Sequence, residues 1–468
     1  MLLKYFYDPK LAQASYMVDC QAAGVAIVID PARDIRPYLA TAEAEGLRIT
    51  HVTETHIHAD YVSGTRELAA ATGATMYLSD EGGHDWRYAY PDRDIHLLKD
   101  GDTFMVGNIR FEALHTPGHT PEHMCYQITD TAAADRPIGI FTGDFIFVGT
   151  VGRPDLLEEA AGIANTKEPG ARQQFANIQR FQQLPDYLQI WPGHGAGSAC
   201  GKGLGSIPST TLGYEKLFNP AFQFDDEDRF VEWLLRDQPE APRYFARMKY
   251  VNRVGPALLR DLPQPQQLPA EQLAAIAASD AQLIDARMAS EFIAGHIAGS
   301  LHAPPDSDRF STYVGWYIDY ERPTYLIAHE QDVERLITEL RAIGVDNLRG
   351  YFTPDAIQGE TVTTAELTPQ EALTALEQGA LLVDVRDTAE RVEQHIGGSR
   401  HIPMGFLPRH LDELPRDRLI ILHCAGGVRS LVAASVLQQH GFTNVASVAG
   451  GLDRWLEEQL PSAIPMHH

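Results

Sequence analysis

The chain has 468 residues, more than a single hydrophobic core usually organises, so its length alone predicts two to four domains. Its 63 aspartates and glutamates outnumber its 38 lysines and arginines, which gives a formal net charge of −25. Such an acidic chain repels phosphate backbones and anionic lipid, so we expect no nucleic-acid partner and no membrane partner.

The N-terminus and the cysteines indicate the compartment. The first twenty residues contain no basic segment followed by an apolar one, and no later stretch approaches 18 uninterrupted apolar residues. We therefore expect a cytoplasmic protein. The four cysteines are too few and too scattered for a disulfide framework, so any that matter should act as thiols.

Short apolar strands alternate with amphipathic helices in the first half of the chain. Strands are predicted at 25–30 and 49–55, and helices around 36–45 and across 63–72. This alternation predicts an α/β fold with layered sheets and helices. Later the composition changes, and the proline- and glutamine-rich stretch at 259–272 is typical of a linker.

Histidines and aspartates follow the ends of several of these apolar strands. The loop THIHADYVSG at 55–64 follows one predicted strand, and three later stretches add further candidates. Because α/β sheets place their sites at the carboxyl ends of strands, this pattern predicts one metal site. The candidate side chains are His56, His58, Asp60, His115, His119, His123, Asp144 and His194.

Four such strand ends in this order resemble the metallo-β-lactamase fold, an αββα sandwich, and most of all its glyoxalase II and persulfide dioxygenase branch. The resemblance covers about the first 250 residues. In the dinuclear hydrolases of that superfamily the loop reads HxHxDH, and its last two residues hold a second metal together with a distal histidine. Here Asp60 and His194 remain, but Tyr61 stands in the last position. A phenol, with a pKa of about 10, is a poor ligand at neutral pH.

The resemblance implies a ligand set for a single metal. In the persulfide dioxygenase family the iron ligands are the first histidine of the loop, the histidine of PGHT and the aspartate of TGD. These correspond to His56, His119 and Asp144, and two imidazoles with one carboxylate suit one mononuclear non-haem Fe(II) per chain. His58 and Asp60 then orient the ligands and water.

Four more residues are candidates for contact with the substrate or for catalysis. In that family the arginine of GRPD lies near the thiol carrier, which implies a substrate contact for Arg153, with a structural salt bridge as the alternative. Tyr61 and His194 are also expected at the substrate, although Tyr61 could serve only the hydrogen bonding of its loop. Cys200, six residues after His194, could accept sulfane sulfur or be only a small residue in a flexible loop.

An internal repeat follows the linker. LIDARMASEFIAGHIAGSLHAP at 283–304 matches LVDVRDTAERVEQHIGGSRHIP at 382–403 with ten identities at an offset of 99 residues, as from Asp285 to Asp384. Units of this length predict tandem domains, because solenoid repeats are much shorter. The expected domains are 1–255, 265–355 and 362–468.

The last domain contains a candidate nucleophile. In LIILHCAGGVRS at 419–430 an apolar strand precedes Cys424, and an amphipathic helix is expected from about Leu431. This resembles the active-site loop of rhodanese sulfurtransferases, whose N–H groups stabilise a thiolate or persulfide. The spacing from Cys424 to Arg429 is one residue shorter than the Cys-x₅-Arg cradle of phosphatases, which favours sulfur transfer. The expected cradle residues are Ala425, Gly426, Gly427 and Val428.

The middle domain lacks this nucleophile. Its equivalent segment at 323–340 has His329 and Glu330 after the strand, no cysteine, and a shortened loop without glycine. A carboxylate there would repel a sulfane anion. We therefore expect a catalytically inactive domain that is retained for spacing or for docking its neighbours.

Taken together, the motifs resemble persulfide dioxygenase–rhodanese fusions of the CstB type over nearly the whole chain. The resemblance implies Fe(II)-dependent oxidation by O₂ of a low-molecular-weight persulfide of glutathione, coenzyme A or a bacterial thiol. Sulfite would form and accept sulfur from Cys424 to give thiosulfate, in sulfide detoxification, and we expect a homo-oligomer. The alternatives are a glyoxalase II-like dinuclear zinc thioester hydrolase fused to a sulfurtransferase, and a sulfur-relay scaffold without catalysis.

Overall fold

The computed structural model describes residues 1–92, 94–159 and 165–462. The chain divides into two compact units: the first holds Met1–Asp261 and Arg341–Gly344, and the second holds Leu262–Leu340 and Val345–His468. Within the described residues, every helix is too short or too polar to cross a lipid bilayer.

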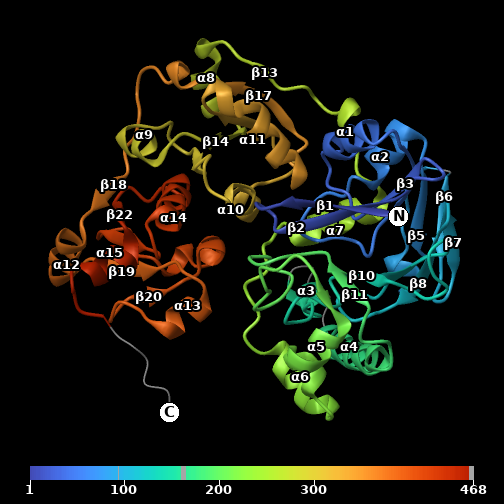
Figure 1. Ribbon diagram of the computed structural model, residues 1–468. Coiled ribbons are helices and arrows are strands. Elements are labelled where there is room, and N and C mark those ends of the chain that lie inside the picture. Colours follow the sequence, from blue (N-terminus) through green and yellow to red (C-terminus); the bar gives the residue numbers. More distant parts are fainter. Residues whose placement is uncertain (93, 160–164, 463–468) are drawn as a thin grey trace. The chain divides into compact units, whose positions relative to one another are not determined.

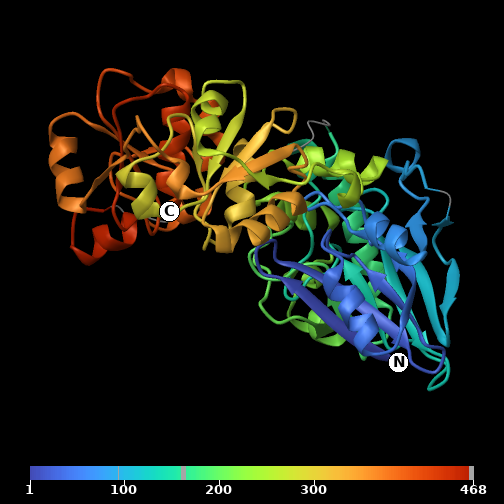
Figure 2. The same ribbon diagram turned by 90° about the horizontal axis from the view of Figure 1, so that it is seen from above.

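The first unit contains two six-stranded sheets, blue to green in Figure 1 and seen from above in Figure 2. One sheet has the spatial order β1 (Leu2–Asp8), β2 (Gln13–Cys20), β3 (Val25–Ile29), β4 (Arg48–Thr53), β5 (Thr75–Ser79), β6 (Ile95–Leu98). The other has the order β12 (Thr210–Thr211), β11 (Gln189–Pro192), β10 (Gly139–Gly143), β9 (Met124–Asp130), β8 (Ile109–His115), β7 (Thr103–Val106).

Alternation of side chains along the strands gives each sheet two apolar faces. Val18 and Ile27 of one sheet share a buried cluster with Phe111 and Phe141 of the other, so the two sheets pack face to face. Helices α1 (Arg36–Ala44) and α2 (Thr65–Thr72) share a second cluster with the outer face of the first sheet. Helices α4 (Lys167–Gln182) and α6 (Glu227–Leu235) do the same for the other sheet. The expected αββα sandwich is confirmed. The remaining α-helices of this unit are α3 (Leu156–Glu159), α5 (Leu212–Phe218) and α7 (Phe245–Val254).

Strand direction brings the candidate loops to one edge of the sandwich. Strands β3 and β4 run parallel, as do β10 and β11, so the segments after all four leave at the carboxyl ends. Because β9 runs antiparallel to β10, the loop that connects β8 to β9 lies at that same edge. The fold therefore collects the loops after β3, β4, β8, β10 and β11.

The second unit consists of two five-stranded parallel sheets with one shared topology. The first has the order β13 (Gln266–Gln267), β17 (Leu348–Phe352), β16 (Thr324–Ile327), β14 (Gln282–Asp285), β15 (Leu301–His302). The second has the order β18 (Ala365–Leu367), β22 (Val445–Val448), β21 (Ile420–His423), β19 (Leu381–Asp384), β20 (Arg400–His401). The repeat in the sequence is thus a repeat of the fold.

Helices flank both of these sheets. The α-helices are α8 (Leu273–Ala277), α9 (Ala289–Ala294), α10 (Phe310–Tyr317), α11 (Glu330–Ala342), α12 (Pro369–Glu377), α13 (Thr388–Glu393), α14 (Val428–Gln439) and α15 (Gly451–Glu457). Short 3₁₀ turns across the chain are η1 (His84–Trp86), η2 (Pro220–Gln223), η3 (Leu259–Asp261), η4 (Ala270–Gln272), η5 (Pro354–Ala356), η6 (Met404–Arg409) and η7 (Leu411–Glu413).

Two expectations of local structure need correction. The stretch at 259–272 is not a bare linker, because Gln266 and Gln267 pair in parallel with β17 and open the middle sheet. Helix α14 begins at Val428 and not near Leu431, since Gly427 adopts a left-handed φ of 97° at its N-cap and turns the chain into the helix earlier.

Helix α14 is also not amphipathic. All residues from Ser430 to Leu437 are buried, because one side packs on its own sheet and another meets the middle domain, where the Ser435 hydroxyl accepts a hydrogen bond of 3.0 Å from the His302 N–H. A helix that is covered all round has no polar face.

The two repeats of the second unit share one hydrophobic core cluster. Tyr313 and Trp316 of α10 belong to the same buried cluster as Cys424 and the apolar residues of α14. The Trp316 ring lies so close to Gly405 that a Cβ there would come within 2.3 Å of it. The Tyr317 hydroxyl donates a hydrogen bond of 2.5 Å to the Met404 carbonyl. The middle domain therefore docks on its neighbour.

Candidate metal centre and cysteine loop

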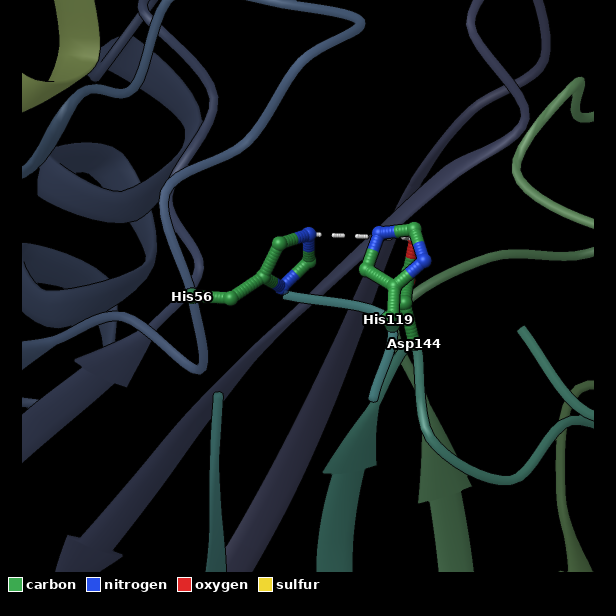
Figure 3. Close-up of side chains that lie close together, drawn as sticks. All are labelled: His56, His119 and Asp144. Atoms are coloured by element: carbon green, nitrogen blue, oxygen red, sulfur yellow. Dashed lines mark ion pairs between the residues drawn. The ribbon is translucent and has the colours of Figure 1, made fainter. Parts of the chain in front are cut away.

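Three buried side chains from different loops converge at the edge of the sandwich: His56 after β4, His119 between β8 and β9, and Asp144 after β10 (Figure 3). Asp144 Oδ2 lies 3.8 Å from His56 Nε2 and 3.5 Å from His119 Nε2. One ligand atom from each lies within 4.8 Å of the others, and in the part of the chain that the structure describes these three atoms have no hydrogen-bond partner. Buried polar atoms left unpaired are costly, so three of them around one point fit a cation between them.

Protonation states favour cation binding at this triad. Burial lowers the pKa of His119 to about 4 and lowers the pKa of His56 well below its usual value, so both imidazoles are neutral at neutral pH. Burial alone would raise the pKa of Asp144, but His194 outweighs it and lowers that pKa. Two neutral imidazoles and one carboxylate are in the state that a metal ion requires.

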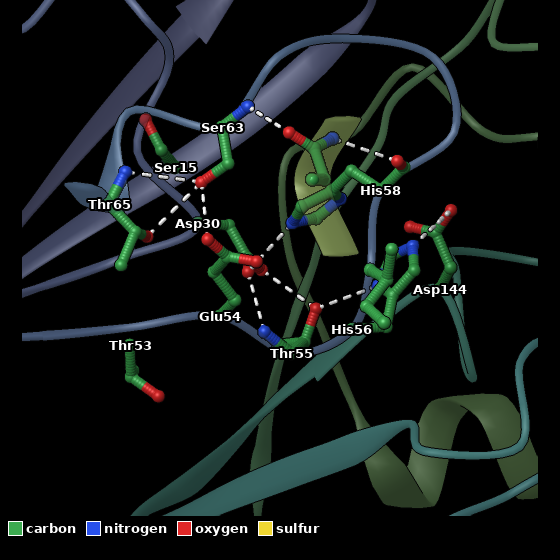
Figure 4. Close-up of polar contacts among 12 residues, drawn as sticks. Ser15, Asp30, Thr53, Glu54, Thr55, His56, His58, Ser63, Thr65 and Asp144 are labelled. Atoms are coloured by element: carbon green, nitrogen blue, oxygen red, sulfur yellow. Dashed lines mark hydrogen bonds and ion pairs between the residues drawn. The ribbon is translucent and has the colours of Figure 1, made fainter. Parts of the chain in front are cut away.

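The second nitrogen of each imidazole is held by a neighbour. His56 Nδ1 lies 3.0 Å from the Thr55 hydroxyl, which donates a hydrogen bond of 2.9 Å to Asp30 (Figure 4). His119 Nδ1 lies 2.8 Å from the carbonyl oxygen of Arg153. Both contacts suit an N–H on Nδ1 and leave Nε2 with its lone pair toward Asp144.

His58 and Tyr61 turn toward Asp30 and away from the triad. His58 Nε2 lies 3.0 Å from Asp30 Oδ1, as Figure 4 shows, and burial of His58 is outweighed by this carboxylate, which raises the pKa of His58. The Tyr61 hydroxyl donates to the main-chain carbonyl of Asp30 at 3.4 Å, and burial raises its pKa well above the usual value. Tyr61 thus serves the hydrogen bonding of its loop, and a substrate contact for it stays a prediction.

Asp30 was missed by the sequence analysis. Its carboxylate contacts the Thr55 N–H and hydroxyl as well as His58, so it organises the whole metal loop. The available signal was its position directly after strand β3, the same position from which the other candidates were found.

A second buried cluster joins the triad through Asp144. His194 Nδ1 lies 2.7 Å from Asp144 Oδ1, and His194 Nε2 lies 2.7 Å from Asp60 Oδ2. Burial alone would lower the pKa of His194, but the two carboxylates raise it well above its usual value. Asp60, His194 and Cys200 form the second group that could hold a metal. Burial raises the pKa of Cys200, so this side chain is a thiol and not a thiolate.

Arg153 is occupied by structural partners. Its guanidinium forms two hydrogen bonds with Asp155, of 2.7 Å and 2.6 Å, and donates to the carbonyls of Ala199 and Pro239. This is the salt bridge that the sequence analysis considered as the alternative, and any contact with substrate would require that pair to open.

The two other histidines of the β8–β9 region lie outside the triad. His115 Nε2 lies 2.8 Å from the Pro121 carbonyl. His123 lies 2.8 Å from the Thr116 hydroxyl through Nδ1, and its Nε2 accepts a hydrogen bond of 3.2 Å from the Asp144 N–H. His123 therefore positions the backbone of a candidate ligand.

Cys424 lies directly after β21, in the loop that leads into α14, as expected. Its side chain is buried, and its sulfur accepts a hydrogen bond of 3.1 Å from the Gly427 N–H and lies 3.6 Å from the Ser430 hydroxyl. The helix N-terminus behind this loop carries partial positive charge, which favours a sulfur anion. Ala425, Gly426, Gly427 and Val428 form the loop that surrounds it.

Arg429 is fixed by a carboxylate. Its two terminal nitrogens form hydrogen bonds of 2.6 Å and 2.7 Å with Glu390. The middle domain keeps the matching carboxylate, Glu291, which lies 3.0 Å from His329. Only Ala328 and His329 separate β16 from α11, so this domain has no room for a cysteine cradle.

Two family models match the chain. The metallo-beta-lactamase superfamily model matches residues 9–194, and the rhodanese-like domain model matches residues 268–347 and 368–458. The chain belongs to the metallo-beta-lactamase superfamily. It consists of a metallo-beta-lactamase domain followed by two rhodanese-like domains.

Individual relatives support this assignment. A crystal structure described as a metallo-beta-lactamase from Staphylococcus aureus subsp. aureus COL is 43% identical, covers 75% of this chain and 99% of that one, and has a TM-score of 0.70. A beta-lactamase hydrolase-like protein of Xylella fastidiosa is 30% identical over 56% of this chain and 61% of that protein. A hydroxyacylglutathione hydrolase of Polaromonas sp. is 30% identical over 50% of this chain and 92% of that protein. The chain spans 60% to 61% of the length of the first curated relatives that it matches.

Proposed function

We propose that this protein is a persulfide dioxygenase joined to a sulfurtransferase. The first unit oxidises a low-molecular-weight persulfide with O₂ to sulfite, and the last domain transfers sulfur to sulfite to give thiosulfate, in sulfide detoxification in the cytoplasm. The substrates are persulfides of glutathione, coenzyme A or a bacterial thiol. The fusion raises the effective concentration of each product for the next step.

The observation that carries this proposal is the set of three unpartnered buried atoms, one each from His56, His119 and Asp144. Two imidazoles and a single carboxylate are the donor set of non-haem Fe(II) oxygenases. One Fe(II) held there supplies reactivity toward O₂. Thr55 and the Arg153 carbonyl orient the two imidazoles, and burial of all three side chains restricts water.

The chemistry of Cys424 follows from its surroundings. The Cys424 thiolate first attacks the outer sulfur of a second low-molecular-weight persulfide, whose sulfur–sulfur bond breaks and whose thiol leaves. The persulfide formed on Cys424 is then attacked at its outer sulfur by the sulfur of sulfite. The sulfur–sulfur bond of the persulfide breaks, thiosulfate forms, and Cys424 leaves as a thiolate. The Gly427 N–H and the start of α14 stabilise that thiolate, and Glu390 holds the Arg429 guanidinium in place through a charge-assisted pair.

A dinuclear zinc thioester hydrolase is the second candidate. The cluster of Asp60, His194 and Cys200 beside Asp144 favours it, because these side chains could hold another metal ion. The similarity to a hydroxyacylglutathione hydrolase points in the same direction.

Metal content and oxygen uptake decide between the two functions. We expect about one iron per chain and oxygen consumption when iron-loaded protein receives glutathione, coenzyme A or bacterial-thiol persulfide. His119→Ala should abolish uptake, whereas His115→Ala, a histidine of the same region that lies outside the triad, should retain it. A protein that carries a zinc pair and cleaves thioesters at full rate under argon would contradict the proposal.

A further inference from the structure

A buried lysine of the first unit has no assigned role. Lys249, on helix α7, is only 6% exposed, and among the described residues its ammonium nitrogen has no hydrogen-bond partner. The ammonium lies over the ring of Trp86, whose centroid is 5.4 Å from Nζ. A buried ammonium group without a hydrogen-bonding partner lowers the stability of the fold. Lys249 is therefore not explained by a structural role, and a role in binding has to be considered.

Helix α7 is fastened to the metal loop. The Asn252 side chain donates hydrogen bonds to the carbonyls of His58 and Tyr61, at 2.9 Å and 2.7 Å, and accepts one from the Ser63 N–H at 2.9 Å. Lys249 precedes Asn252 by three residues, so both side chains lie on one face of the helix. That face lies against the loop that contributes His56.

The charges around Lys249 belong to the metal pocket. Glu122 acts on it most strongly among them, followed by Cys200, Asp144 and Asp60. In return, its positive charge contributes to lowering the pKa of both His56 and His119. Burial lowers the pKa of Lys249 to about 8, so the group still carries its charge at neutral pH.

Glu122 does not neutralise this ammonium by direct contact. One of its oxygens accepts a hydrogen bond of 2.8 Å from the Ile57 N–H, and the other has no hydrogen-bond partner within residues 1–92, 94–159 and 165–462. The lysine therefore retains all three of its N–H donors for another group.

We propose that Lys249 is the anion-binding residue of the metal pocket and that its ammonium holds a small sulfur oxyanion of the sulfite class. The identity of the anion rests on the proposed function, since oxidation of a sulfane sulfur places a sulfur oxyanion beside the triad. If the protein is a thioester hydrolase instead, the Lys249 ammonium would bind the carboxylate product of that hydrolysis.

Direct binding of sulfite tests this without turnover. Protein loaded with zinc, which has no redox chemistry, is titrated with sulfite under argon in a calorimeter. We expect Lys249→Met to weaken sulfite binding about 10- to 100-fold, because it removes a charge-assisted hydrogen bond. Lys249→Arg should stay within about fivefold of the parent protein. The control is Lys216→Met, because Lys216 already binds Asp186 and the Leu184 carbonyl.

Stability provides a readout that does not depend on the ligand. Because Lys249 is buried without a hydrogen-bonding partner, Lys249→Met should unfold at the same temperature as the parent protein or at a higher one. A structural lysine would give the opposite result. Unweakened sulfite binding by a folded Lys249→Met protein, or no sulfite binding by the parent, would overturn the inference. Tighter binding of acetate than of sulfite would assign the pocket to a carboxylate and would also overturn it.

The two proposals fail in different ways. If the parent protein binds sulfite through Lys249 but consumes no oxygen, the dioxygenase assignment is lost and the anion site stands. If it consumes oxygen and Lys249→Met binds sulfite equally well, only the anion site is lost.

Discussion

The two rhodanese-like domains share their strand order and a buried aspartate–arginine pair, but they differ at the loop that holds the cysteine. In the middle domain Asp285 binds Arg287 through hydrogen bonds of 2.9 Å and 2.6 Å, and in the last domain Asp384 binds Arg386 at 2.9 Å and 2.7 Å. Both arginines reach a main-chain carbonyl eight residues further on. The contacts that hold the fold were kept, so the cysteine loop can be lost without losing the domain.

The helices after the two loops show what the middle domain does instead. Helix α11 has buried residues on one side and a charged face opposite, whereas α14 is buried all round. The difference arises because the middle domain covers α14, through α10 and the edge strand that contains His302. The domain without a nucleophile thus completes the core of the domain with one.

Removal of the nucleophile should have the largest effect. Cys424→Ser should lower thiosulfate formation by about 1,000-fold or more, since a hydroxyl cannot carry the persulfide. Oxygen uptake should continue, and sulfite should accumulate in place of thiosulfate, as measured by chromatography of the products. Cys20→Ser is the control. Unchanged thiosulfate output would refute the division of labour between the units.

The second-largest effect is expected from a substitution in the hydrophobic cluster that the two rhodanese-like domains share. Trp316→Ala should lower the free energy of unfolding by about 3 to 5 kcal/mol, because it leaves a cavity between α10 and Gly405. Urea unfolding of the full chain measures this. Tyr317→Phe removes one hydrogen bond to Met404 and should cost about 1 kcal/mol. Equal costs for the two variants would mean that the domains are held by that hydrogen bond alone.

Glu390 and Glu291 occupy matching positions in the two rhodanese-like domains, so the same substitution can be compared in both. Glu390→Gln should lower sulfur transfer by about tenfold, because it weakens the charge-assisted pair that fixes Arg429 beside Cys424. Glu291→Gln makes the same change in the middle domain, where the partner is His329, and should leave the rate unchanged. Steady-state thiosulfate formation compares them, and equal losses would mean that both carboxylates act only on stability.

A smaller effect is expected from a buried histidine of the middle domain. Burial lowers the pKa of His302 to about 3, whereas an unfolded histidine has a pKa of about 6.5. As pH falls below about 6.5, the unfolded chain takes up a proton that the folded chain refuses, so stability is lost progressively toward pH 3. His302→Gln should therefore reduce the slope of unfolding temperature against pH in this window.

The matching position supplies the control for this pH test. His401→Gln alters a side chain that is only half-buried. The slope should not vanish in His302→Gln, since burial also lowers the pKa of His423, to about 4. Identical slopes for the two variants would contradict the assignment to His302.

Local patterns predicted much of this molecule. The ten identities of the repeat predicted a shared fold, because they include glycine and proline residues that constrain the backbone, and both sheets have the same strand order. His56, His119 and Asp144 could be found because each follows a strand, and the structure brings them together.

Packing between distant segments could not be predicted in the same way. Lys249 comes from a helix far along the chain, and its position depends on how α7 meets the metal loop. The burial of α14 on every side depends on the middle domain, so the prediction of an amphipathic helix from its own sequence was wrong. Asp30 is different, since its place after a strand was visible in the sequence.

Because the middle domain packs on α14, the last domain is not expected to be stable when it is expressed as a separate fragment. A fragment starting near residue 362 would keep the whole cysteine loop and yet lose Leu301, Tyr313 and Trp316, which share a buried cluster with Val432 and Val436 of α14. Such a fragment would self-associate when expressed alone. The smallest part of this chain that would stay soluble as a sulfurtransferase is therefore the pair of repeats, in which the copy without a cysteine covers the apolar side of α14.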